Sequence, residues 1–110
     1  MDVTSFGSNT VTATYTVPTN TFPFSDNVEE QADTVKWAWA SPWGRTNEKA
    51  HSGQFSWTDS PGSGYEPNTN TALSMFANLS GSNSPVLLFW HIYNLEDNLD
   101  FGYVEVSTDG

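Results

Sequence analysis

The chain contains no cysteine among its 110 residues. Disulfide bonds, thiolate zinc sites and cysteine nucleophiles are therefore excluded. Long apolar runs are also missing, because the longest, "PVLLFWHIY" at 85–93, is far too short to cross a bilayer. Met1 is followed at once by a polar stretch, so we predict no secretory signal peptide at this end.

Basic residues are scarce, with 3 Lys and Arg against 13 Asp and Glu and a net charge of −10. Such a surface repels phosphate, which argues against nucleic-acid partners and disfavours anionic membranes. Acidity fits an extracellular setting, where calcium is plentiful and carboxylates can hold it. Together with the absence of cysteine, this composition favours a secreted or cell-surface bacterial domain.

Charged residues make up only 15% of the chain, and aromatic residues equal them at 15%. A few large rings must therefore supply much of the buried area. Apolar alternation predicts strands at 9–17, 35–40, 53–58, around Leu73 and Met75, and at 86–93 and 101–108. Residues 27–33 read as a short strand or turn, although "VEEQAD" is the one place where a helix is conceivable. Residues 59–70, with "DSPGSG", form a loop.

Short strands with polar loops predict an all-β fold, an antiparallel β-sandwich. Residues 1–20 are interpreted as an N-terminal strand, or the tail of a preceding domain, plus a linker. Residues 21–110 are interpreted as the sandwich module. Both faces of 86–93 are apolar, so a loop or neighbouring domain covers the second face, or that face is an exposed binding patch.

Several pieces of the sequence resemble MAM-like modules in a fixed order. They are "WGRT" at 43–46, "AHSG" at 50–53, "SWTDSP" at 56–61, Tyr65, "NLSG" at 78–81, and the closing segment at 87–110. The resemblance covers residues 24–110. Such modules accompany secreted bacterial peptidases of the immune inhibitor A and subtilisin-like types, and surface proteins.

The resemblance implies a jelly-roll fold related to galactose-binding-like domains. It also implies a non-catalytic role beside a catalytic or adhesive domain. In the family, "STDG" is usually followed by another Gly, a "TW" pair and further strands. We therefore expect a module that is truncated at its C-terminal end and lacks its last strands.

No catalytic residue is predicted. The chain has neither a nucleophile elbow nor an HExxH pattern, and we expect a core role for His91 and a loop position for His51. Glu96, Asp97 and Asp100 could imitate a glycosidase pair, but they share one hairpin loop, whereas catalytic carboxylates face each other across a cleft.

Calcium is the cofactor that the carboxylates favour, because turn carboxylates and loop carbonyls are the oxygen ligands Ca²⁺ takes. The candidate ligands are Asp26, Glu29, Asp59, Glu96, Asp97 and Asp100. The alternative is that these are solvated turn carboxylates. Arg45, the only arginine, is predicted to make a bidentate ion pair with Glu96 or Asp100.

Trp43, Tyr65 and Trp90 are the candidate ligand-binding residues, since indole rings stack on the apolar faces of sugars. The other tryptophans are expected in the core. The sequence thus favours an accessory module whose partner is a neighbouring domain of the parent protein, with a glycan or protein surface as a further partner. A carbohydrate-binding module with an aromatic platform is the main alternative, and a structural adhesin or stalk domain is a third.

Overall fold

The structure, a computed structural model, describes residues 2–6, 10–14 and 18–108. It is predominantly non-helical and has a few short strands, which confirms the prediction only in that the fold is not helical. In chain order the elements are β1 (Asp2–Phe6), β2 (Thr10–Thr14), β3 (Thr19–Asn20), η1 (Gln31–Lys36), β4 (Gly44–Thr46), β5 (Ser56–Thr58) and β6 (Phe76–Ala77).

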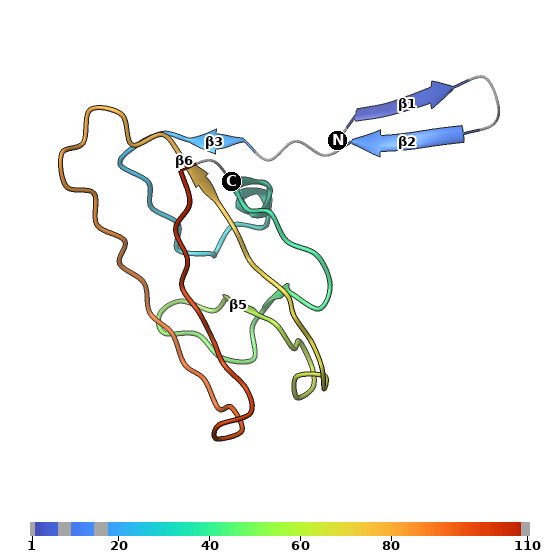
Figure 1. The fold of residues 1–110 in the computed structure, drawn as a ribbon, viewed down its shortest axis with the longest axis vertical. Coiled ribbons are helices and arrows are strands. Elements are labelled where there is room, and N and C mark those ends of the chain that lie inside the picture. Colours follow the sequence, from blue (N-terminus) through green and yellow to red (C-terminus); the bar gives the residue numbers. More distant parts are fainter. Residues whose placement is uncertain (1, 7–9, 15–17, 109–110) are drawn as a thin grey trace.

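The described strands form three separate pairs. β1 and β2 make an antiparallel hairpin that projects from one end of the molecule (Figure 1). β2 confirms the strand predicted over 9–17 for residues 10–14; residue 9 and residues 15–17 lie outside the described residues. β4 pairs with β5 in antiparallel register, which confirms part of the strand predicted at 53–58.

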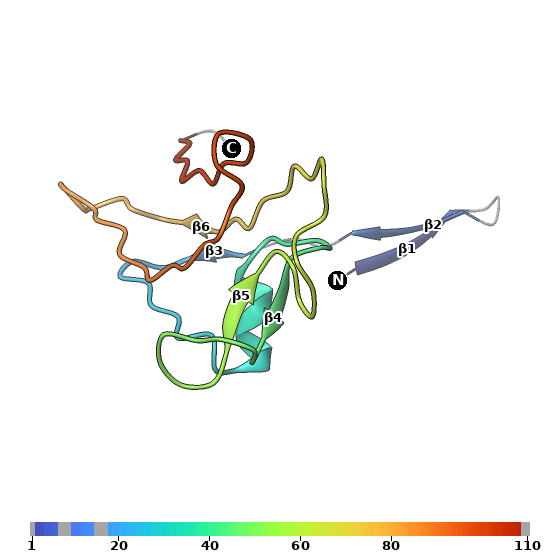
Figure 2. The same cartoon turned by 90° about the horizontal axis from the view of Figure 1, so that it is seen from below.

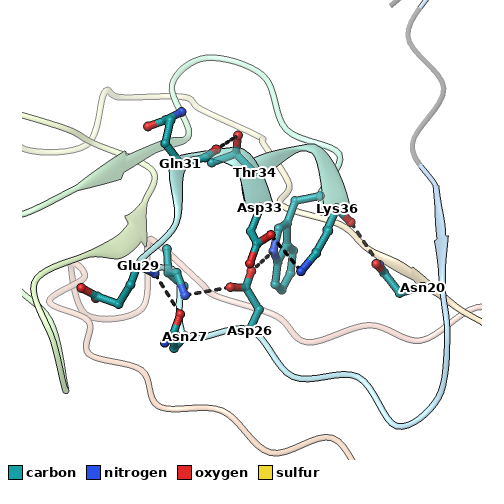
Figure 3. Close-up of polar contacts among 10 residues, drawn as sticks. Asn20, Asp26, Asn27, Glu29, Gln31, Asp33, Thr34 and Lys36 are labelled. Carbon is teal, nitrogen blue, oxygen red and sulfur yellow. Dashed lines mark hydrogen bonds and ion pairs between the residues drawn. The ribbon is translucent and has the colours of Figure 1, made fainter.

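β3 and β6 form a parallel pair between segments far apart in the sequence. Asn20 in β3 is the buried polar residue of this junction, with 9% of its surface exposed. Its side-chain amide donates to the carbonyl oxygens of Lys36, at 3.2 Å, and Phe76, at 3.1 Å. One side chain therefore connects β3, the end of η1 and β6, and Figure 3 shows its bond to Lys36.

The strand predicted at 35–40 is wrong for its first two residues, which belong to the 3₁₀ helix η1 (Gln31–Lys36), and only Ala38 of the remainder takes part in a β-bridge. The Asp33 amide donates to the Glu30 carbonyl at 3.0 Å, and Lys36 pairs with Asp33 at 2.9 Å. These contacts between residues three apart favour a helical turn over an extended chain. Extended pairing begins only at Ala38, which forms a bridge with Ser74.

Half-buried rings gather where η1 ends and β5 begins. Trp57 lies 6.2 Å from Trp37 and 5.5 Å from Trp39, and Phe24 meets Trp37 edge-on at 6.1 Å. No apolar side chain is fully buried among the described residues. The predicted aromatic interior is therefore only half covered. The radius of gyration is 16.6 Å, against about 13 Å for a compact chain of this size.

The two strands predicted at 86–93 and 101–108 are also corrected by the structure. Both runs are extended, yet neither is assigned to a strand or a bridge. They diverge from the turn that joins them and do not pair as the two strands of a hairpin (Figures 1 and 2). A strand needs a partner at hydrogen-bonding distance, and the local alternation that predicted these strands does not provide one.

Two further features bear on the predictions. No helix in the described part of the chain is long and apolar enough to span a membrane.

The predicted domain boundary after residue 20 and the closed two-layer jelly roll both stay predictions. β3, at the end of the predicted N-terminal segment, pairs with β6 inside the predicted module.

Candidate functional site

A hollow with varied polar and apolar lining lies at the end of the β4–β5 pair. Because Gly44 pairs with Thr58, the residues just outside the pair, Trp43 and Asp59, lie together at its end. The hollow has a volume of about 420 Å³. It is lined by Ser41, Pro42, Trp43, Asp59, Ser60, Pro61, Ser63, Gly64 and Glu66.

Hydrogen bonds within the turns fix the walls of this hollow. The Trp43 amide donates to the Ala40 carbonyl at 3.0 Å, and the Ser60 hydroxyl lies 3.1 Å from a carboxylate oxygen of Asp59. Glu48 reaches across to accept from the Gly62 amide at 3.0 Å. This amide, followed by the Thr46 hydroxyl, lowers the pKa of the Glu48 carboxyl.

The hollow combines an indole ring, two carboxylates and three serine side chains. Such a set can accept hydrogen bonds from hydroxyl groups while the ring packs on an apolar face. The Trp43 indole N–H is buried and has no hydrogen-bond partner among the described residues. The Trp57 indole N–H is in the same state, so this feature is not particular to the hollow.

Tyr65 lies half-buried between two loops instead of standing out as a platform. Its hydroxyl donates to Asp100 at 2.6 Å and accepts from the Glu96 amide at 3.2 Å. The bond to Asp100 is the largest of the causes that raise the pKa of Tyr65. Tyr65 therefore ties the loop at 59–70 to the acidic turn at 96–100.

Asp26 and Glu29, both candidate metal ligands, hold the chain around η1 by accepting N–H groups. Asp26 accepts from the Val28 amide at 2.8 Å and from the Trp37 indole at 2.6 Å; Figure 3 shows it beside Asn27 and Asp33. Glu29 accepts from the amides of Phe55 and Gln54, both at 2.9 Å. The Phe55 amide and then the Gln54 amide lower the pKa of the Glu29 carboxyl.

The structure places Arg45 elsewhere than the predicted ion pair with Glu96 or Asp100. Its guanidinium donates to the carbonyl of Val28 at 2.7 Å, to the carbonyl of Glu29, and to the side chain of Gln31 at 3.4 Å. It also lies 3.3 Å from the centre of the Phe55 ring. The correction has a local reason: β4 places Arg45 beside the turn at 28–31, while Tyr65 engages Asp100.

The six predicted calcium ligands fall in three places. Asp26 and Glu29 flank the turn before η1, Asp59 lines the hollow, and Glu96, Asp97 and Asp100 occupy the acidic turn. Within the described residues, no group of three or more His, Asp or Glu side chains is placed to hold a metal. Calcium takes six to eight oxygen ligands, so loop carbonyls and water would have to complete any site; calcium binding stays a prediction.

Trp90 lies on the surface of the first extended run, with 77% of its area exposed. The His51 ring stacks on it at 3.8 Å and 9°. His91 is exposed as well, which corrects the expected core position, and it stacks on Tyr93 at 5.6 Å. Trp43, Tyr65 and Trp90 therefore occupy three separate surroundings, not one platform.

Sequence reasoning missed four polar members of the hollow, Ser41, Ser60, Ser63 and Glu66. The signal available was the turn-forming string "DSPGSGYE" directly after β5. This string folds back beside Trp43, which precedes the partner strand β4. In comparisons with protein family models, with curated proteins and with solved structures, no match was found.

Proposed function

We propose that the chain is a non-catalytic accessory module of a secreted or cell-surface bacterial protein. In this proposal its jelly-roll sandwich is completed when the module packs against a neighbouring domain. The observation that supports it is the exposure of two extended runs, residues 86–93 and 101–106, which we call the two arms. The acidic composition agrees with an extracellular location, where calcium is plentiful.

The arms carry a large apolar surface. Each of their eleven large apolar side chains is more than half exposed: Val86, Leu87, Leu88, Phe89, Trp90, Ile92, Tyr93, Phe101, Tyr103, Val104 and Val106. Soluble monomers rarely show contiguous apolar patches of this kind unless the patch binds something. Burying one such side chain contributes about 1.5–3 kcal/mol, so covering several of them matches the net stability of a typical domain, about 5–15 kcal/mol.

Hydrogen exchange tests this proposal directly. Backbone amides of the arms should exchange at least about tenfold more slowly in the longer polypeptide encoded by the same reading frame than in the chain alone, because a covering domain limits their opening. Amides of the exposed loop at 66–70 serve as the internal control and should exchange equally in both. A reading frame that encodes no second domain, or arms that exchange equally in both proteins, contradicts the proposal.

A second candidate function, carbohydrate binding, is favoured by the hollow beside Trp43 and Asp59. The indole ring suits the apolar C–H face of a sugar, and the carboxylates can accept hydrogen bonds from its hydroxyl groups. On an array of oligosaccharides, Trp43→Ala should lose about five- to tenfold of any affinity, since stacking of this size is worth about 1–1.5 kcal/mol. Trp90→Ala, on the arm, is the matched control and should bind normally. An array without a hit removes this candidate.

A further inference from the structure

The arms have strand geometry without strand partners. Rings two residues apart lie 5.6 Å from each other for Phe89 and His91 and again for His91 and Tyr93, and 6.2 Å for Phe101 and Tyr103. This is close to the two-residue repeat of an extended chain, about 6.5–7 Å. Among the described residues, no backbone hydrogen bond of the structure's turns, loops or bridges involves residues 86–93 or 101–106.

This backbone limits the kind of partner that can cover an arm. Peptide N–H and C=O groups lose water when an apolar surface covers them, and an unpaired buried group costs about 1–3 kcal/mol. A helix or a lipid surface offers no matching row of donors and acceptors. An extended polypeptide does, because an added strand pairs with these groups at the spacing of a sheet.

The charges of the chain select among extended partners. No Lys or Arg occurs after Lys49, whereas Glu96, Asp97 and Asp100 follow the first arm and Glu105 lies in the second. A second copy would bring another net charge of −10 to the same surface. Two of its three bases are already engaged, Lys36 with Asp33 and Arg45 with the turn at 28–31.

We propose that the first arm, residues 86–93, binds an added β-strand of a partner whose side chains alternate between apolar residues and Lys or Arg. This inference rests on the proposed function and names the partner chemistry for the same surface. Backbone pairing supplies the register and the apolar side chains of the partner cover one face of the arm, while a base at the partner's end beside Tyr93 lies nearest the acidic turn at 96–100.

The test uses the full chain and an eight-residue peptide of alternating valine and lysine. Calorimetry should detect binding, and amides of residues 86–93 should exchange about tenfold more slowly with the peptide present. Two control peptides should bind at least about tenfold more weakly: alternating valine and glutamate, which reverses the charge, and the valine–lysine peptide with alternate amides N-methylated, which blocks pairing.

A pair of variants isolates the charge contribution. Asp97→Asn in the acidic turn should lower the affinity for the valine–lysine peptide by up to about fivefold at low salt, which is the range expected for an exposed ion pair. Glu30→Gln, before η1, removes the same charge at an exposed site outside the arms and should leave the affinity unchanged. Equal effects of the two variants overturn the assignment of the bases to the acidic turn.

The remaining outcomes each decide the inference. Absence of peptide binding, or equal binding of the N-methylated peptide, overturns strand addition. Self-association of the chain that protects residues 86–93 without peptide makes a second copy the occupant and also overturns it. If the arms are protected in the longer polypeptide while the peptide does not bind, the accessory role stands and only strand addition fails. If the peptide binds while the arms stay unprotected in the longer polypeptide, strand addition stands and the accessory role fails.

Discussion

Replacing Arg45 by methionine should open the loop around Glu29 and speed hydrogen exchange at the Gln54 and Phe55 amides by about a hundredfold. Arg45 is a charged donor to two carbonyls of the turn at 28–31, and hydrogen bonds of this kind contribute about 1.5–3 kcal/mol each. Lowering the free energy of local opening by roughly 3 kcal/mol corresponds to a hundredfold faster exchange, since about 1.4 kcal/mol is tenfold. Methionine keeps an apolar contact with the Phe55 ring, so the change removes mainly the hydrogen bonds.

Two further variants define the cause of the Arg45 effect. Arg45→Lys keeps the charge but lacks the planar fork, so it should show most of the acceleration. Lys49→Met removes the same charge from an exposed position nearby and should change exchange at Gln54 and Phe55 by less than about threefold. The Asn78 amide, bonded to the Asn20 carbonyl at 2.9 Å, reports on a different junction and should stay constant in all three. Unchanged exchange in Arg45→Met contradicts the role assigned to this residue.

Local patterns predicted the features that depend on neighbours in sequence. Alternation located the strand that contains β5, and turn-forming residues located the loop at 59–70. The segment around Leu73 and Met75 does alternate, because both side chains are half-buried while Ala72 and Ser74 are exposed. These properties follow from the two-residue repeat of an extended chain, which a single sequence displays directly.

Pairing between distant segments is what the sequence did not reveal. The parallel pair of β3 and β6, the bridge of Ala38 with Ser74 and the carbonyl contacts of Arg45 all join residues at least 16 positions apart. Charge alone suggested a carboxylate partner for Arg45, since 13 acids were available, yet the geometry of β4 gave it carbonyl oxygens instead. The same reason explains the arms: alternation shows that a segment is extended, and it does not show what pairs with it.

Asn20→Asp should be the most disruptive single change at the β3–β6 junction. Asn20 is buried and its amide donates to two carbonyls, and aspartate replaces that donor with a charged acceptor. Losing both bonds and placing a carboxylate against carbonyl oxygens should weaken the junction by roughly 3 kcal/mol. Exchange of the Asn78 amide, and of the Ala38 and Ser74 amides that bridge beside it, should then accelerate by about a hundredfold.

Asn78→Asp is the matched control for this change, because it adds the same charge two residues beyond the Phe76 carbonyl. Asn78 uses its side-chain oxygen only as an acceptor, from the amide of Ser80 at 3.0 Å and its hydroxyl at 2.7 Å, and aspartate keeps that acceptor. Exchange at Ala38 and Ser74 should therefore remain within about threefold of the original chain. If both variants accelerate these amides equally, added charge and not the lost donor controls the junction, and the central position given to Asn20 is wrong. If only Asn20→Asp does so, one buried amide holds η1 and the β3–β6 pair together, a contact that neither composition nor periodicity could have indicated.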